Sequence, residues 1–205
     1  LILRKLKQDV FTDILFKPGV WNKGFVTEVT LNGDIYIQFE SNFLKVLESR
    51  QPKLNQLCSE QPKLTLNHFK KCSPNNIYYA HYLNAWYRSK INKVEIDHVN
   101  VFFLDFGTSC KVKFAFLKSF EPEQDPLRDL PYLAVKGNLE AVPSDSSLTW
   151  SSRATYKLLN MLSEIDLVYI KISHPPFNSK PCQIQLCHKV NNEFILLNMK
   201  LDSDH

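Results

Sequence analysis

Four β-prone runs follow one another closely between residues 77 and 117. They are Ile77–Leu83, Trp86–Ile96, Val99–Phe106 and Lys111–Leu117. Asn84, Asp97-His98 and Gly107 stand at the joints, where such residues favour tight turns. Because the runs are short and tightly linked, they predict a small bent β-barrel rather than a βαβ unit.

The residues before this segment predict a β-hairpin followed by helices. Phe25–Thr30 is β-prone, Asn32-Gly33 carries a hairpin-turn signal, and Ile35–Phe39 alternates apolar and polar residues. Ser41 or Asn42 can cap a helix. Proline breaks helices, so we expect Pro52 to separate this helix from a second helical piece that extends toward Pro62.

The residues after the four runs predict a loop, a helix and further strands. We expect a loop at Glu121–Pro131, strands at Ala134–Val142, Leu167–Ser173, Gln183–Val190 and Phe194–Leu201, and a helix at Ser151–Asp166. The first and last parts are each too small to close a core. The predicted fold is therefore mainly β with a few helices (β-rich α+β), with a barrel inserted between the halves of one split β-rich domain.

Composition excludes several classes of protein. Only five glycines occur, and neither a dinucleotide-binding nor a P-loop motif is present. The net charge of +4 is too mild for a dedicated nucleic-acid binder. Five cysteines without a framework spacing predict reduced thiols, and Cys182, Cys187 and His188 lack the paired spacing of a metal site. We expect no metal, no cofactor and no membrane-spanning segment, and the first residue, Leu1, suggests a piece of a longer protein.

Aromatic residues gather around two of the predicted turns. Tyr82 and Tyr87 flank the first turn, and Phe103 and Phe106 lie just before Gly107. If both turns lie at one end of a small barrel, the four rings line a concave mouth. Ring faces attract a flat cation with about 0.5 to 2 kcal/mol per contact, and a guanidinium suits them better than an ammonium.

Two segments resemble the core of the Tudor family. Trp86-Tyr87-Arg88 and Val101–Gly107 resemble its pattern WYRA…V.V.FIDYGN. Gly24–Val29, Ile35–Gln38 and the Leu130–Pro143 segment are similar to the flanks of an extended Tudor domain, so the likeness covers roughly residues 24–200. It implies one module over residues 1–205: a Tudor barrel at 65–120, and an OB-fold or staphylococcal-nuclease-like subdomain from residues 20–64 and 121–205.

The resemblance also implies a binding site. The four cage aromatics of the family fall on Tyr82 (with a one-residue shift), Tyr87, Phe103 and Phe106, and the cage asparagine falls on Thr108. Asp105 is a further candidate contact, although it can instead pair with Arg88 across strands. Phe103 and Phe106 can alternatively be barrel core, and Trp86 is expected to be core or a wall.

Family members bind arginine-rich tails, often of Piwi proteins. The resemblance therefore implies a scaffold module, not an enzyme, which recognises an extended arginine-containing N-terminal tail of a Piwi/Argonaute protein in piRNA silencing. The implied location is cytoplasmic, in perinuclear germ granules (nuage), with RNA an indirect partner.

Two alternative functions remain. The first is binding of RNA or single-stranded DNA by the OB-like part, with Tyr36, Tyr169 and Phe177 as stacking platforms, although no basic stripe alternates with aromatics in the sequence. The second is nuclease activity, but Glu28, Asp34 and Glu40 are scattered and form no tight carboxylate cluster.

Overall fold

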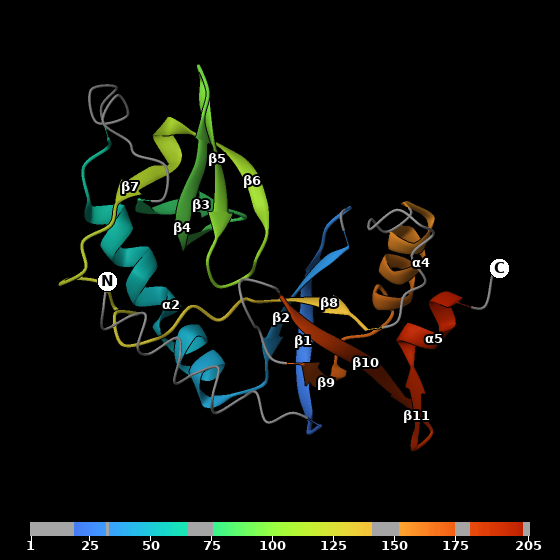
Figure 1. The fold of residues 1–205 in the computed structure, drawn as a ribbon. Coiled ribbons are helices and arrows are strands. Elements are labelled where there is room, and N and C mark those ends of the chain that lie inside the picture. Colours follow the sequence, from blue (N-terminus) through green and yellow to red (C-terminus); the bar gives the residue numbers. More distant parts are fainter. Residues whose placement is uncertain (1–18, 32, 65–75, 141–151, 175–180, 203–205) are drawn as a thin grey trace. The chain divides into compact units, whose positions relative to one another are not determined.

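The chain forms two compact units. Our structure is a computed structural model that describes residues 19–31, 33–64, 76–140, 152–174 and 181–202 (Figure 1). Residues 41–133 form one unit, named here the five-stranded unit. Residues up to Glu40 and from Ala134 onward form the other, named the six-stranded unit. The boundaries therefore fall at 40/41 and 133/134, whereas the sequence analysis placed them at 64/65 and 120/121.

The five-stranded unit is a sheet of short antiparallel strands. Its strands are β3 (Ile77–Tyr82), β4 (Ala85–Val94), β5 (His98–Phe103), β6 (Ser109–Lys113) and β7 (Leu117–Ser119). They lie in the order β6-β5-β4-β3-β7. The predicted single strand at Lys111–Leu117 is wrong, because a 3₁₀ turn, η1 (Phe114–Phe116), ends β6 and redirects the chain. The following residues pair with β3 as a fifth strand.

The turn between β3 and β4 has only two residues. Leu83 and Asn84 have φ angles of 44° and 68°. Positive φ at both positions is the geometry of the hairpin turns that match the right-handed twist of the strands. Asparagine tolerates this conformation, whereas leucine rarely adopts it. The turn aligns Tyr82 directly with Ala85 across the hairpin.

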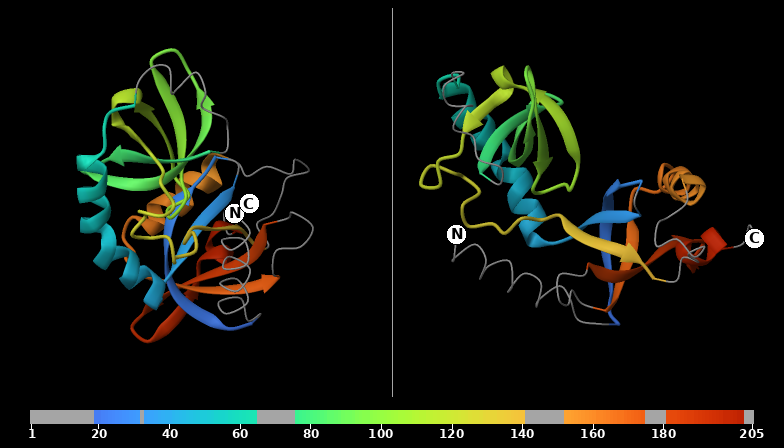
Figure 2. Two further views of the ribbon diagram at one scale, coloured as in Figure 1. Left: turned by 90° about the vertical axis from the view of Figure 1, so that its left-hand side faces the viewer. Right: turned by 45° about the horizontal axis from the view of Figure 1, so that its top comes forward.

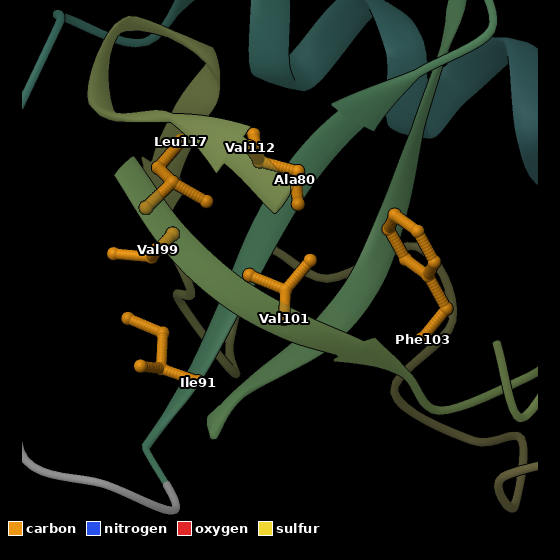
Figure 3. Packing of buried hydrophobic residues seen from close by; sticks show 7 residues of the cluster. All are labelled: Ala80, Ile91, Val99, Val101, Phe103, Val112 and Leu117. Carbon is orange, nitrogen blue, oxygen red and sulfur yellow. The ribbon is translucent and has the colours of Figure 1, made fainter. Parts of the chain in front are cut away.

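Alternating apolar side chains fill the interior of this unit. The buried cluster consists of Ala80, Ile91, Val99, Val101, Phe103, Val112 and Leu117 (Figure 3). Three of its members, Val99, Val101 and Phe103, are every second residue of β5, so they lie on one face of that strand. The sequence period thus explains the core directly.

One long helix, α2 (Asn42–Glu60), belongs to the same unit. As predicted, Ser41 caps it, and its hydroxyl accepts a hydrogen bond from the Leu44 amide at 3.3 Å. The predicted break at Pro52 is wrong, because the helix continues through that proline. Pro52 is exposed and removes one backbone hydrogen bond, while Leu54 and Cys58 further along the helix are fully buried. Packing of this apolar face overrides the local penalty.

The six-stranded unit combines strands from both ends of the chain. The strands are β1 (Trp21–Val29), β2 (Asp34–Phe39), β8 (Val135–Leu139), β9 (Val168–His174), β10 (Cys182–Val190) and β11 (Glu193–Leu196). They lie in the order β11-β10-β8-β2-β1-β9, and β10 also pairs with β9. That pairing closes β1, β2, β8, β10 and β9 into a ring of five, with β11 attached to β10.

Strands that are far apart in sequence are neighbours in this unit. Residues 21–24 of β1 pair with residues 168–171 of β9, which Figure 2 shows as blue and orange segments side by side. The prediction that the early hairpin and the late strands share one sheet system is confirmed. Gly24 permits close approach here, because a Cβ atom at this position would lie 2.4 Å from the Gln38 carbonyl oxygen.

Two helices accompany these strands. The first, α4 (Ser152–Leu162), confirms the predicted helix at Ser151–Asp166, although Ser151 lies outside the described residues. The predicted last strand is partly wrong, since α5 (Leu197–Asp202) follows the short β11. Leu197 and Leu201 are both buried, which is helical spacing. The Asn198 carboxamide oxygen accepts a hydrogen bond from the Leu186 amide and fixes this turn against β10.

Candidate functional site

The strand register of the five-stranded unit brings the predicted aromatic residues to one face. Tyr87 pairs with Ala80 across the β3–β4 hairpin, so Tyr87 lies on the same face as this core residue. Tyr82 is two residues beyond Ala80 on β3 and therefore also lies on that face. Phe103 is a core residue at the end of β5, as Figure 3 shows.

The four rings form a continuous chain of contacts, named here the aromatic cluster (Tyr82, Tyr87, Phe103 and Phe106). The centroids of Tyr82 and Phe103 are 5.6 Å apart, and those of Phe103 and Tyr87 are 5.5 Å apart. Tyr87 in turn contacts Phe106 at 5.3 Å with an interplanar angle of 84°. Edge-to-face pairs of this kind are attractive. The structure thus brings together all four residues chosen from the sequence.

The four rings differ in how much solvent they meet. Phe103 is only 2% exposed and belongs to the hydrophobic core, which agrees with the alternative that it is a core residue. Tyr82 is 40% exposed at the rim, while Tyr87 and Phe106 are partly buried and pack against the core. Phe103 therefore forms the buried base of the aromatic cluster, and the other three rings surround it.

Burial also affects the ionisation of Tyr87. Desolvation raises the pKa of its hydroxyl above the ordinary value for tyrosine. The hydroxyl is therefore protonated at neutral pH, and the ring carries no negative charge. Attraction of a cation to this ring depends on its π face.

The turn after β5 places Phe106 and Thr108. The Gly107 amide donates to the Phe103 carbonyl oxygen at 2.8 Å, and the Phe103 amide donates to the Thr108 carbonyl oxygen at 2.9 Å. Gly107 has a φ angle of 78°, a conformation that glycine adopts without strain. The two backbone bonds hold Thr108 opposite the base of the aromatic cluster, with its side chain partly exposed.

Asp105 has a different role from its neighbours. Its carboxylate forms a two-pronged ion pair with Arg88, with Nε–Oδ2 at 2.9 Å and Nη2–Oδ1 at 2.6 Å. Asp105 is 2% exposed and Arg88 is fully buried. The candidate ligand contact at Asp105 is thus corrected: its carboxylate is occupied inside the unit, as the alternative of a cross-strand ion pair expected.

The guanidinium of Arg88 also fixes the loop that follows the barrel. It donates hydrogen bonds to three backbone carbonyl oxygens at 2.9–3.1 Å, those of Leu127, Leu130 and Pro131. Burial by itself lowers the pKa of Arg88, but the charge and hydrogen bonds of Asp105 more than offset this effect, so that the pKa is raised. A permanently charged arginine thus joins β4, the β5–β6 turn and the loop.

The opposite face of the β3–β4 hairpin carries a second aromatic group that the sequence analysis did not consider. His81 lies 5.0 Å from the Trp86 ring and 5.7 Å from the Phe116 ring. Trp86 is the predicted wall residue, and its amide is bound by the Asn55 side chain of α2 at 2.9 Å. Strand alternation could have shown that this group faces away from the aromatic cluster.

Candidate metal and nuclease residues are dispersed. Within the described residues, no group of three or more His, Cys, Asp or Glu side chains is placed to hold a metal ion. Cys182 is buried in the six-stranded unit, which raises the pKa of its thiol to about 12. Asp34 forms an ion pair with Lys136 at 2.7 Å. No helix in the described part of the chain has both the length and the apolar character of a membrane span.

Comparison with known structures shows the same two-part fold. The human TDRD1 extended Tudor domain, solved in complex with a symmetrically dimethylated peptide, matches with a TM-score of 0.75 and 20% identity over 92% of this chain and 90% of that chain. Extended Tudor domain TD3 of mouse TDRD1, solved with a MILI peptide containing dimethylarginine, gives 0.76 and 16%, over 91% and 92%. The BmPAPI extended Tudor domain, solved with sDMA, gives 0.76 and 18%, over 91% and 97%.

These likenesses establish an extended Tudor fold for the chain. A search of curated protein sequences found no match. The family model described as "Tudor domain" matches residues 17–141, which is more than half of the 205 residues. The chain therefore belongs to the Tudor domain family.

Proposed function

We propose that the chain is a binding module for an extended, arginine-containing peptide, and that the arginine side chain enters the aromatic cluster. The observation that carries the proposal is the continuous contact of four rings around a buried phenylalanine at one end of the barrel. A guanidinium is planar and weakly hydrated, so ring faces can hold it without a paired carboxylate.

The surroundings of the aromatic cluster support a rigid site. The Arg88–Asp105 ion pair and the hydrogen bonds of Arg88 to the loop fix the turn that carries Phe106. Preorganised rings lower the entropic cost of binding, since little has to be ordered when the ligand arrives. The proposal assigns recognition to the rings and positioning to Arg88 and Asp105.

The proposed partner is the arginine-rich N-terminal tail of a Piwi/Argonaute protein. Support comes from the relatives: the mouse TDRD1 domain was solved with a MILI peptide and the human domain with a symmetrically dimethylated peptide. A role as a non-catalytic scaffold of piRNA silencing in perinuclear germ granules of the cytoplasm follows from this proposal. Co-purification of the full-length protein with a Piwi protein, lost in a cluster variant, would test it in cells.

Selectivity for methylated arginine is proposed to be weak. Threonine stands at position 108, where the family pattern has asparagine. Its hydroxyl is shorter than a carboxamide and has fewer hydrogen-bonding groups. We expect a preference for symmetric dimethylarginine of less than about tenfold, or less than about 1.4 kcal/mol. Calorimetric titration of matched methylated and unmethylated Arg-Ala peptides measures this ratio, and a hundredfold preference would contradict it.

Tyr82→Ala and Phe106→Ala test the site directly. Phe103→Ala is less suitable, because removing a buried phenylalanine costs about 3–5 kcal/mol of stability. We expect the double variant Tyr82→Ala/Phe106→Ala to weaken peptide binding by at least about fivefold, since each ring contact contributes about 0.5–2 kcal/mol.

The matched control is Phe116→Ala. Phe116 is 47% exposed in the same unit and contacts His81 on the opposite face of the hairpin. This variant should bind the peptide as the parent does. Unchanged affinity in the folded double variant would place the arginine outside the aromatic cluster.

A further inference from the structure

The outer surface of the six-stranded unit carries aromatic and lysine side chains in alternation. On β9, Val168, Ile170 and Ile172 are buried. Tyr169 and Lys171 alternate with them and therefore lie on the outer face. The strand pairing extends this outer row to β1, because Lys171 is aligned with Trp21 and Tyr169 with Lys23.

The same row continues across β10 to β11. Lys189 of β10 is aligned with Phe194 of β11. The rings of Tyr169 and Phe194 meet across β10, with centroids 5.0 Å apart and an interplanar angle of 87°. Six side chains from four adjacent strands thus form one surface, named here the aromatic–lysine face: Trp21, Lys23, Tyr169, Lys171, Lys189 and Phe194.

Large rings on this face are open to solvent. Trp21 is 39% exposed and Phe194 is 57% exposed. Lysine ammonium groups lie over both rings: Lys171 Nζ is 5.2 Å from the centroid of Trp21, and Lys189 Nζ is 5.7 Å from that of Phe194. Cation–π contacts at exposed sites are weak, so an incoming flat group and an incoming anion can replace them.

The charge of the face is positive. None of the aligned positions that join its members carries a carboxylate. Two acidic side chains lie near its margin. Glu140 accepts hydrogen bonds from Ser173 and Gln185 at 2.7 Å and 2.6 Å, and Glu193 begins β11 at the hairpin end. Three lysines therefore face solvent between rings.

We propose that the aromatic–lysine face binds single-stranded nucleic acid, with bases stacking on Trp21 and Phe194 and phosphates meeting Lys23, Lys171 and Lys189. Binding surfaces for single strands combine exposed aromatic platforms with a positive track for the backbone. Four adjacent strands at about 4.8 Å spacing give a width of roughly 14 Å, enough for both features. This site lies on a different unit from the aromatic cluster and does not depend on the peptide-binding proposal.

Fluorescence anisotropy with a labelled single-stranded RNA of about 12 nucleotides tests the proposal on the whole chain. We expect Trp21→Ala and Phe194→Ala each to weaken binding by about fivefold or more, as lost base stacking requires. Lys171→Gln and Lys189→Gln should each reduce the slope of log affinity against log salt concentration by about 0.7. Circular dichroism confirms that each variant remains folded, which the exposure of these side chains favours.

Matched controls separate the face from the rest of the chain. Tyr156 is 62% exposed on α4, and Lys45 is exposed on α2, so Tyr156→Ala and Lys45→Gln should bind RNA as the parent does. Single-stranded DNA of the same sequence shows whether the ribose contributes. Equal affinity for duplex RNA would overturn the proposal, because paired bases cannot stack on the rings. So would displacement by poly-glutamate of equal charge combined with unchanged RNA binding by Trp21→Ala, since the face would then be a general anion surface.

Discussion

The two units of this chain close their sheets by opposite routes. In the five-stranded unit, β3, β4, β5 and β6 each pair with the next strand along the chain, and only the β3–β7 pairing skips strands. In the six-stranded unit, β1 pairs with β9, and β2 with β8, across most of the chain. Local closure keeps the residues of a site close in sequence, whereas non-local closure assembles a surface from distant segments.

The largest expected effect concerns independent folding. We expect residues 41–133 to fold alone, because their strand contacts are nearly all local. Residues 134–205 alone should not fold, since they lack β1 and β2 and cannot bury their apolar face. Circular dichroism with urea titration measures both, and adding residues 1–40 in trans should restore the second transition. Cooperative unfolding of residues 134–205 by themselves would remove the contrast between the units.

A buried and a surface ion pair offer the next comparison. Asp105→Asn leaves the fully buried Arg88 without its counter-charge, so we expect a loss of about 3–5 kcal/mol in the free energy of unfolding. Lys136→Gln in the six-stranded unit removes a partner from Asp34 at a site where the lysine side chain is 45% exposed. That loss should stay within about 1 kcal/mol. Equal losses in chemical denaturation would show that burial does not set the difference.

Two glycines of the six-stranded unit test how closely its distant strands approach. A Cβ at Gly24 would lie 2.4 Å from the Gln38 backbone oxygen and 2.6 Å from Ile170 Cδ1. A Cβ at Gly137 would meet the Cys182 Sγ at 3.0 Å, a side-chain atom that can shift. Gly24→Ala should therefore destabilise the protein by about 1–3 kcal/mol more than Gly137→Ala. Thermal melting of the two variants decides this, and a larger effect at Gly137 would contradict the structure.

The smallest effect is expected at the two proposed binding surfaces. Thr108→Asn restores the family residue and should increase the preference for dimethylated over unmethylated peptide, by less than about 1.4 kcal/mol. The same substitution should leave RNA affinity unchanged, because Thr108 and the aromatic–lysine face belong to different units. Peptide titration and RNA anisotropy on one preparation measure both. A parallel change in RNA affinity would show that the two sites are coupled.

Much of the five-stranded unit could be predicted because its signals are local. Turn residues and alternation located β3, β4 and β5 within a few residues, and the motif Trp86-Tyr87-Arg88 pointed to the aromatic cluster. The errors arose where packing outweighed a local rule. Pro52 lies inside α2, the apolar run after Lys111 contains a 3₁₀ turn, and the predicted last strand ends in a helix.

The candidate site was predicted as a set of residues but not as a set of roles. Sequence spacing cannot distinguish a ring that meets solvent from one that forms the core, because both alternate with period two. The structure separates Phe103, which is 2% exposed, from Tyr82, which is 40% exposed. It likewise assigns Asp105 to Arg88 through bonds of 2.9 and 2.6 Å.

The sequence by itself determined the elements, the family resemblance and the identity of the four rings, since each depends on residues close together in the chain. Only the tertiary structure decided that Trp21, Tyr169 and Phe194 share a surface with three lysines. These residues lie on strands β1, β9 and β11, which about 170 residues of chain separate at the extremes. Hydrogen bonding between strands sets which side chains become neighbours, and that register is a property of the folded sheet rather than of any one segment.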